Sequence, residues 1–168
     1  MPVSFLPRMI ADKLTDLTPE LLRSQGIRLL MLDFDNTIVP YTTTVPTEEM
    51  EAWLARMNAL EDISLCIVSN SHNDRVPAFC RQRGLDVITH ARKPFPKGIN
   101  ECLAKYAITA DQAALAGDQI YTDTLGANGA GVRSILVKTI DNHNFWLKAR
   151  HVLELPFIFA ASNRRIDK

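Results

Sequence analysis

Residues 27–37 read Ile-Arg-Leu-Leu-Met-Leu-Asp-Phe-Asp-Asn-Thr, a largely apolar run that stops abruptly in two carboxylates and a hydroxyl. The apolar part predicts a buried strand. Paired acids at the end of a buried strand require compensation of their charge, which a divalent metal or a phosphoryl group would supply. Because residues i and i+2 of an extended segment point the same way, we expect Asp33 and Asp35 beside one reacting atom.

Two neighbouring carboxylates suit covalent phosphoryl transfer. One aspartate can attack phosphorus and form an aspartyl-phosphate, while a second group protonates the leaving oxygen and then activates water. Asp33 suits the first role and Asp35 the second. A surface turn is the alternative interpretation, because Asp, Asn and Thr are common turn residues.

Three further apolar runs, at residues 63–68, 87–89 and 113–116, are followed by polar side chains that suit the same chemistry. These side chains are Ser69, Asn70, Lys93, Asp118 and Asp123. Taken singly, each has an ordinary explanation as a turn residue, a solvated charge or a helix cap. In chain order, they supply the amide or hydroxyl donor, the cation and the hard oxygen ligands for Mg²⁺ that metal-assisted phosphoryl transfer needs.

These residues resemble the four motifs of the haloacid dehalogenase-like (HAD) hydrolases, which match here as Asp33-x-Asp35-x-Thr37, Ser69, Lys93 and Gly117-Asp118-x-x-x-x-Asp123. The resemblance runs from about Ile27 to Val137. Asp-Asn-Thr in the first motif, Ser-Asn in the second and Gly-Asp-Gln-x-x-Thr-Asp in the last look like subclass IIIA. That group contains the YqeG-type proteins and the phosphatidylglycerophosphate phosphatases of mitochondria and plastids.

The resemblance implies a role for each matching residue. Asp33 would be the nucleophile and Asp35 the general acid and base. Mg²⁺ would be bound by Asp118, the Asp33 carboxylate and the Asp35 backbone carbonyl, with Asp123 as a supporting carboxylate. The residues expected to hold the phosphoryl group are Thr37, Ser69, Asn70 and Lys93.

The choice of lysine has an alternative, because Lys97 lies one helical turn beyond Lys93. We prefer Lys93, which precedes Pro94 as the family's lysine commonly does. Proline also biases the residue before it towards extended geometry, which suits a loop at the end of a strand.

The wider pattern predicts an α/β fold. Strands are expected near residues 27–33, 63–68, 86–89, 113–116 and 134–137, alternating with helices near 47–61, 73–83, 96–106 and 122–130. This alternation indicates a doubly wound, mostly parallel sheet, the Rossmann-like core that the resemblance also implies. Such sheets bind ligands at the carboxyl ends of their strands, where Asp33, Ser69 and Asp118 fall.

The connections leave space for a minimal cap domain or none. HAD enzymes usually carry a cap after the first motif or between the second and third, and these gaps hold one helix each. Residues 38–46 are expected to form a small flap, too short for a closing lid. An open site suits a bulky substrate whose phosphate alone enters, such as a lipid headgroup, a phosphoprotein or a nucleic-acid end.

We expect residues 1–168 to form a single phosphatase domain with two extensions. Residues 1–26 are expected to be helical, because apolar side chains recur there at helical spacing, at Phe5, Leu6, Met9, Ile10, Leu14 and Leu17. Residues 139–168 mix apolar and basic side chains, and Pro156 is expected to interrupt a single long helix. Packing on the sheet, a subunit contact in a homo-oligomer and peripheral contact with the inner membrane surface all fit these extensions.

Composition agrees with one enzyme domain and limits the partners. The chain is 46% hydrophobic and 23% charged, which is ordinary for a globular protein, and its formal net charge of zero implies no overall attraction to nucleic acid. Three widely spaced cysteines read as thiols of a reducing compartment. By these criteria, and without a long apolar stretch, the sequence predicts a cytoplasmic protein.

The sequence therefore predicts a Mg²⁺-dependent phosphatase acting on a phosphomonoester. By resemblance alone, phosphatidylglycerophosphate is the leading substrate. A phosphoprotein, a nucleotide and a sugar phosphate are the alternative substrates. A noncatalytic phospho-binding module on the same fold is the alternative from another functional class.

Overall fold

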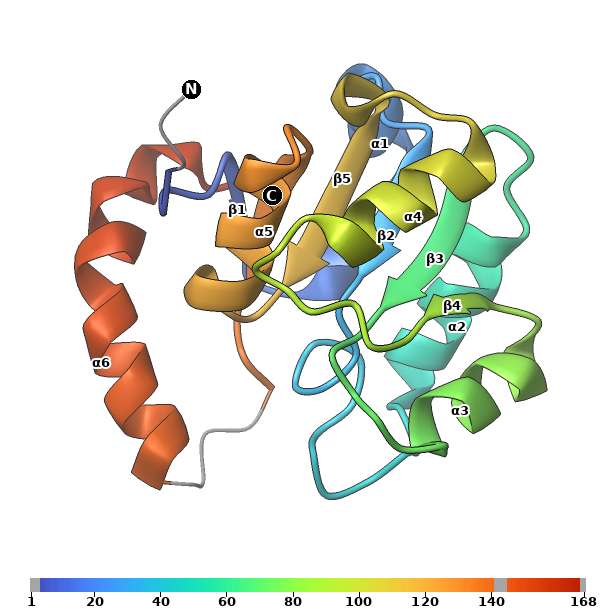
Figure 1. Cartoon of the computed structure of the whole chain (residues 1–168), viewed down its shortest axis with the longest axis horizontal. Helices are drawn as coiled ribbons and strands as arrows, with labels where there is room; N and C mark the ends of the chain where they lie inside the picture. Colours follow the sequence, from blue (N-terminus) through green and yellow to red (C-terminus); the bar gives the residue numbers. More distant parts are fainter. Residues whose placement is uncertain (1–3, 141–144, 167–168) are drawn as a thin grey trace.

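A computed structural model of the chain describes residues 4–140 and 145–166. In it, six parallel strands form one sheet in the order β1-β6-β5-β2-β3-β4 (Figure 1). The strands are β1 (Met9–Ala11), β2 (Leu29–Leu32), β3 (Ser64–Val68), β4 (Asp86–Ile88), β5 (Ala113–Gly117) and β6 (Arg133–Val137). The predicted α/β fold with a parallel sheet is confirmed.

Helices cover both faces of the sheet. They are α1 (Pro19–Ser24), α2 (Glu48–Asn58), α3 (Arg75–Arg83), α4 (Lys97–Tyr106), α5 (Leu125–Gly129) and α6 (Phe145–Ala160). Single turns add η1 (Leu14–Asp16), η2 (Ala110–Gln112), η3 (Ile120–Thr124) and η4 (Ser162–Arg164), of which η3 is π-helical. No cap domain is inserted after β2 or β3 in the part of the chain that is described.

The central strand β2 shows why the sheet is buried on both sides. Leu30 and Leu32 face the core formed with α2 and α3, whereas Leu29 and Met31 face the core formed with α4 and α5. All four side chains are fully buried. A parallel strand apolar on both faces requires helices above and below it, and all six strands then end at one edge of the sheet.

The N-terminal extension differs from the sequence prediction. Met9–Ala11 form the edge strand β1, paired in parallel with β6, instead of part of a helix. All three side chains are buried, so pairing with a distant strand outweighs the helical spacing of the apolar residues. The same extension does contain one short helix, α1, which begins at Pro19 and is capped by the Thr18 hydroxyl.

The C-terminal extension differs as well, because α6 runs through Pro156 without interruption. Pro156 lies on the exposed side of the helix, where solvent can reach the carbonyl group that loses its intrahelical donor. Phe157 packs against Phe5 and Tyr121, and the Glu154 carboxylate accepts from the backbone N–H of Ile120. Residues 141–144 and the side chains of 145–151, including the aromatic Phe145 and Trp146, lie outside the described part.

None of the described helices combines the length and the apolar character needed to cross a membrane.

Candidate active site

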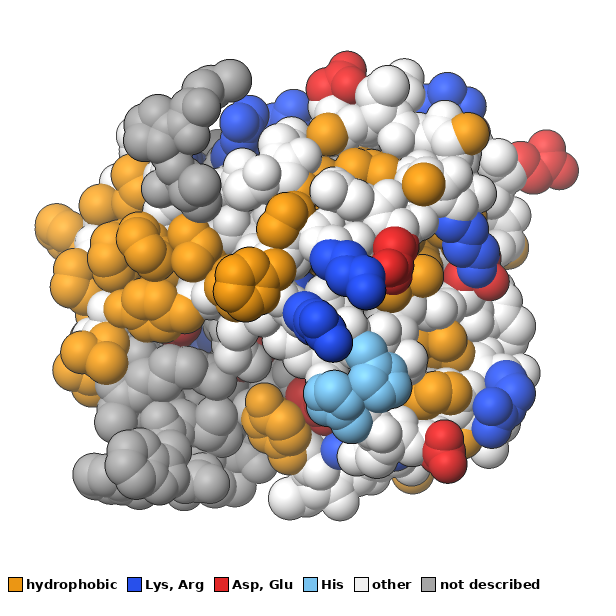
Figure 2. Space-filling view, viewed as in Figure 1, with side chains coloured by type: hydrophobic (Ala, Val, Ile, Leu, Met, Phe, Trp, Pro, Cys, Tyr) orange, Lys and Arg blue, Asp and Glu red, His pale blue; other side chains and the backbone are white. Residues whose placement is uncertain are grey.

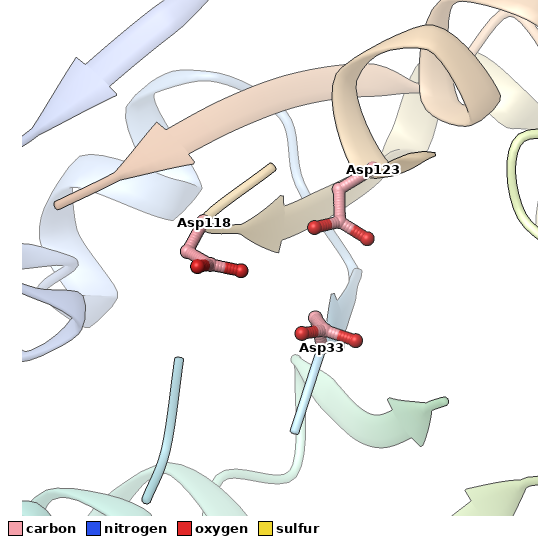
Figure 3. Close-up of side chains that lie close together, drawn as sticks. All are labelled: Asp33, Asp118 and Asp123. Carbon is pink, nitrogen blue, oxygen red and sulfur yellow. The ribbon is translucent and has the colours of Figure 1, made fainter. Parts of the chain in front are cut away.

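Three aspartates meet at the carboxyl edge of the sheet. Asp33 follows β2, Asp118 follows β5, and Asp123 lies in η3. Each offers a carboxylate oxygen, and these oxygens lie within 4.8 Å of one another (Figure 3). All three residues are buried, with 6%, 4% and 1% of their surfaces exposed, so their charges are largely removed from bulk water.

Lys93 is the cation within this cluster. Its Nζ lies 2.6 Å from Asp33 Oδ1 and 2.7 Å from Asp123 Oδ1, and its side chain is 1% exposed. The loop after β4 therefore delivers the ammonium group between two carboxylates that come from other elements. Three carboxylates against one ammonium leave two negative charges in excess when all the groups are ionised.

Burial and neighbouring charges shift the pKa values of Asp33 and Lys93. Burial raises the pKa of Asp33 to about 7; the Lys93 ammonium opposes that shift, and the charges of Asp123 and Asp118 add to it. For Lys93, burial by itself lowers the pKa, but Asp123 and Asp33 outweigh it and hold the pKa above its usual value. The lysine is therefore charged throughout the physiological range. A further cation among the carboxylates would favour ionised Asp33.

Local structure fixes the two aspartates that follow β5. Gly117 precedes Asp118, and a Cβ atom at this glycine would collide with the Asp123 carboxylate. The backbone N–H of Gln119 donates to Asp123 Oδ2 at 3.1 Å, while the hydroxyl of Thr139, just beyond β6, donates to Asp118 Oδ2. The Gly-Asp pattern is thus explained by a close approach of the η3 turn to the end of the strand.

The loop that carries Lys93 is tied to the end of β3. The Asn70 side-chain amide donates to the Lys93 carbonyl at 2.9 Å, and the Lys93 N–H donates to Asn70 Oδ1 at 2.8 Å. Both polar side-chain atoms of Asn70 are thus engaged with the lysine backbone, and the predicted contact of Asn70 with phosphate stays a prediction. Lys97, the alternative lysine, lies on α4 with a 65% exposed side chain, 3.9 Å from Glu101.

Asp35 stands apart from the carboxylate cluster. Its Oδ1 forms an ion pair of 2.8 Å with Nη2 of Arg75 at the start of α3. Burial raises the pKa of Asp35, and the Arg75 guanidinium opposes that shift. Asp33 and Asp35 nevertheless line the same cavity, as expected from their i, i+2 spacing.

That cavity, which we call the chamber, has a volume of about 180 Å³. It is lined by Asp33, Asp35, Tyr41, Ser69, Asn70, Ser71, Lys93, Gln119 and Thr122. Ser69 Oγ accepts from the Ser71 N–H at 3.0 Å, which leaves its own proton available to donate. Thr37 is buried, and its hydroxyl donates to Asp33 Oδ2 over a long 3.4 Å, so it contacts the expected nucleophile itself.

The sequence did not identify a catalytic, phosphate-binding or metal-binding residue in Tyr41, Arg75, Gln119, Thr122 or Thr139, all of which lie in or beside the site. Thr139 follows a predicted strand, so the convergence of strand ends could have pointed to it. Arg75 and Tyr41 carry no comparable signal, since their positions depend on how the flap and α3 pack together.

A larger groove, of about 710 Å³, contains none of the three clustered aspartates. Pro40 and Thr43 of the flap line this groove, while Tyr41 lines the chamber. The flap thus borders both cavities, and Asp33, Asp35 and Lys93 line only the smaller one.

The carboxylate cluster fits a divalent metal ion. Its buried donors are hard oxygens from three side chains, the type of ligand that Mg²⁺ prefers, and their excess negative charge matches that of a doubly charged cation. Among the residues that the structure describes, no sulfur or imidazole ligand belongs to the cluster.

Comparison with known sequences agrees with this geometry. A family model described as mitochondrial PGP phosphatase matches residues 1–140. The protein named probable phosphatase YqeG of Bacillus subtilis is 32% identical over 133 residues, which span 79% of this chain and 77% of that protein.

Solved structures share the fold at low sequence identity. 3-Deoxy-D-manno-octulosonate 8-phosphate phosphatase of Yersinia pestis aligns with a TM-score of 0.54 at 16% identity, covering 87% of this chain and 89% of that one. The cobalt-bound form of the corresponding phosphatase of Haemophilus influenzae aligns with a TM-score of 0.52 at 13% identity, covering 82% and 91%. At these identities the likeness concerns the fold alone.

Proposed function

The chain belongs to the mitochondrial PGP phosphatase family of HAD-type phosphatases, and we propose that it hydrolyses a phosphomonoester through an aspartyl-phosphate on Asp33, with Mg²⁺ as its metal ion. The observation that carries this proposal is the buried cluster of three carboxylates around one ammonium group. Burying several charges away from water is costly. Their presence at the carboxyl edge of the sheet therefore points to a ligand that completes the charge balance.

In the first step, a carboxylate oxygen of Asp33 attacks phosphorus, a phosphorus–oxygen bond to Asp33 forms, and the bond to the leaving oxygen breaks. The Lys93 ammonium is 2.6 Å from Asp33 and is charged at neutral pH, so it can attract an equatorial phosphoryl oxygen beside the nucleophile. The Ser69 hydroxyl, which lines the same chamber, can donate to another. Asn70 serves this step by holding the Lys93 backbone.

Asp35 acts as the general acid in the first step and as the general base in the second. In the first, its protonated carboxyl group gives a proton to the leaving oxygen, so that an alcohol departs. In the second, the carboxylate takes a proton from the water that attacks phosphorus, which returns Asp33 and releases inorganic phosphate. Burial that raises the pKa of Asp35 and a cation that opposes the shift suit a group that must exist in both forms.

Asp33, Asp118 and the Asp35 backbone carbonyl would hold Mg²⁺, with Asp123 supporting the site. When bound, the metal ion would neutralise phosphoryl charge as a Lewis acid. The cobalt-bound form of the Haemophilus phosphatase supports a divalent ion on this fold.

Phosphatidylglycerophosphate is the proposed substrate, and the family description is its main support. The chamber is small and no cap covers it in the described chain, so a substrate can present its phosphate while the remainder stays outside. Large apolar side chains on α6 are exposed and gather over that helix in Figure 2, at Val152, Leu153, Leu155 and Phe159. We propose this side of α6 as the contact with a lipid surface.

The test is phosphate release with Mg²⁺ from phosphatidylglycerophosphate in mixed micelles, set against sugar phosphates, nucleotides and a phosphopeptide. Asp33→Asn is the inactive control. Selective release from the lipid would support the whole proposal. Release only from soluble esters would keep the mechanism and discard the lipid. A folded protein that binds Mg²⁺ and releases nothing would favour a phospho-binding module instead.

A further inference from the structure

Arg75 connects three parts of the molecule around the chamber. Its Nη2 lies 2.8 Å from Asp35 Oδ1 and also donates to the Pro40 carbonyl at 3.2 Å, while its Nη1 donates to the Tyr41 carbonyl at 3.0 Å. Its guanidinium carbon lies 5.1 Å from the ring centroid of Phe34, within range of a cation–π contact. Arg75 is the first residue of α3, so a rigid element anchors all these contacts.

The contacts are those of a fixed side chain. The side chain of Arg75 is 22% exposed and that of Asp35 is 20% exposed, so neither extends freely into solvent. The planar fork of an arginine can bind two acceptors at once while its face rests on an aromatic ring, which a lysine cannot do. Phe34 lies between the two catalytic aspartates in sequence and is itself fully buried against Phe79 of α3.

The flap, residues 38–46, depends on the same side chain. Residues 40–46 form no helix or strand, and two consecutive flap carbonyls accept from Arg75. Tyr41 lines the chamber, so holding its backbone also holds one wall of the chamber. One guanidinium therefore links the proton-transfer residue to the wall beside it.

We propose that Arg75 is a positioning residue that holds the Asp35 carboxylate and the flap in a single arrangement at the mouth of the chamber. The proposal rests on the phosphatase mechanism given above. The 2.8 Å contact between Asp35 Oδ1 and Nη2 of Arg75 fixes the orientation of the carboxylate at the wall of the chamber. Arg75 acts through Asp35 and through the flap, and it does not bind the transferred phosphoryl group.

If Arg75 positions the proton donor Asp35, the effect of replacing Arg75 depends on the leaving group of the substrate. An alkoxide is a poor leaving group and needs a proton as it departs, whereas p-nitrophenolate leaves without one. Misplacing the proton donor therefore slows alkyl esters selectively. The parameter kcat/KM reports steps up to the departure of the leaving group, so it isolates this effect from the later hydrolysis of the aspartyl-phosphate.

The experiment compares the full chain carrying Arg75→Ala with the wild type on an alkyl phosphate, glycerol 3-phosphate, and on p-nitrophenyl phosphate. We expect kcat/KM to fall about 100-fold for the alkyl ester and less than about 5-fold for the aryl ester. Arg75→Lys should recover part of the loss on the alkyl ester, because it restores a charge beside Asp35 but not the two-acceptor fork. Arg81→Ala, an exposed arginine on the same helix, should change neither value.

Equal losses on the two esters, or unchanged kinetics in Arg75→Ala, would overturn the positioning role. If Arg75→Ala does not fold, Arg75→Lys and Arg75→Gln carry the same comparison. A wild type that hydrolyses neither these two esters nor phosphatidylglycerophosphate in mixed micelles would instead count against the phosphatase mechanism on which this role depends.

Amide hydrogen exchange tests the flap contact without any activity. Loss of two acceptor contacts should speed exchange at the amides of residues 41–45 in Arg75→Ala, while α4 and β5 keep their protection. Identical exchange in the flap of the variant and the wild type would show that Arg75 does not hold it.

Discussion

Two lysines, Lys93 and Lys105, form ion pairs with aspartate at similar distances but in very different surroundings. At the carboxyl edge of the sheet, Lys93 sits 2.6 Å from Asp33 and 2.7 Å from Asp123, and these side chains are between 1% and 9% exposed. At the β4 edge, Lys105 lies 2.8 Å from Asp86, and these side chains are 42% and 47% exposed. The Tyr106 hydroxyl donates to the other oxygen of Asp86.

The difference shows that distance alone does not identify a functional ion pair. The Lys105–Asp86 pair balances one charge against one and remains hydrated, so it costs little to form and contributes little. The Lys93 cluster buries three carboxylates against one ammonium group, an arrangement that is expensive unless a further cation completes it. Burial together with unequal charge marks the candidate site.

Replacing one aspartate in each region should give the largest contrast. Asp33→Asn removes the nucleophile, and we expect turnover to fall by about 10⁴-fold or more. Asp86→Asn should leave kcat within about twofold, since Asp86 lies outside the chamber. Phosphate release under saturating substrate measures both, with circular dichroism to confirm the fold. Substantial turnover by Asp33→Asn would remove Asp33 from the role of nucleophile.

Removal of divalent metal should affect the carboxylate cluster around Lys93 and leave the Lys105–Asp86 pair unchanged. Chelation with EDTA should reduce turnover by about 10³-fold or more, because the phosphoryl charge then lacks its main counter-ion. Mg²⁺ at 100 times its Kd should stabilise the metal-free wild type by about 2.7 kcal/mol.

A thermal melt with and without Mg²⁺ measures that stabilisation. Asp86→Asn should respond as the wild type does, while Asp118→Asn should lose most of the response. A melt of Asp118→Asn that shifts as far as the wild type would place the ion elsewhere.

The two lysines should differ in stability when metal is absent. Lys93→Met leaves three buried carboxylates without their cation, and we expect a loss of about 3–5 kcal/mol in the free energy of unfolding. Lys105→Met breaks only an exposed pair and should cost less than about 1 kcal/mol. Urea unfolding in EDTA measures both, and similar losses would contradict the importance given to burial. Mg²⁺ should restore part of the stability of Lys93→Met but little of its activity.

The carboxylate cluster could be predicted from the sequence, because two of its residues directly follow strands. Asp33 and Asp118 follow apolar runs, and parallel strands bring their carboxyl ends to one edge, so their meeting needs no knowledge of loops. Arg75 could not be predicted, because a basic residue in a first helical turn reads as a solvated charge until the flap is packed against it. The edge strand β1 was missed for a similar reason, since its partner β6 lies more than 100 residues away.

The smallest expected effect is the loss, at low pH, of the stability that the exposed Lys105–Asp86 pair contributes. The bonds from Lys105 and Tyr106 hold the pKa of Asp86 below its usual value. A carboxyl group whose pKa is lower in the folded state stabilises the protein above its unfolded pKa of about 3.9, and that stabilisation disappears as pH falls through the folded value. Asp86→Asn should therefore be less stable than the wild type by at most about 1 kcal/mol at pH 7, because the pair is half exposed.

Urea midpoints of the two proteins should converge as pH is lowered below about 4, since the wild-type carboxyl group then becomes protonated and neutral like the amide. Lys105→Ala should show the same convergence, because it removes the other partner of the pair. A gap between Asp86→Asn and wild type that stays constant from pH 7 to pH 3 would mean that packing or the Tyr106 hydrogen bond, and not charge, holds this edge together. The two regions would then differ in the type of interaction that stabilises them as well as in its strength.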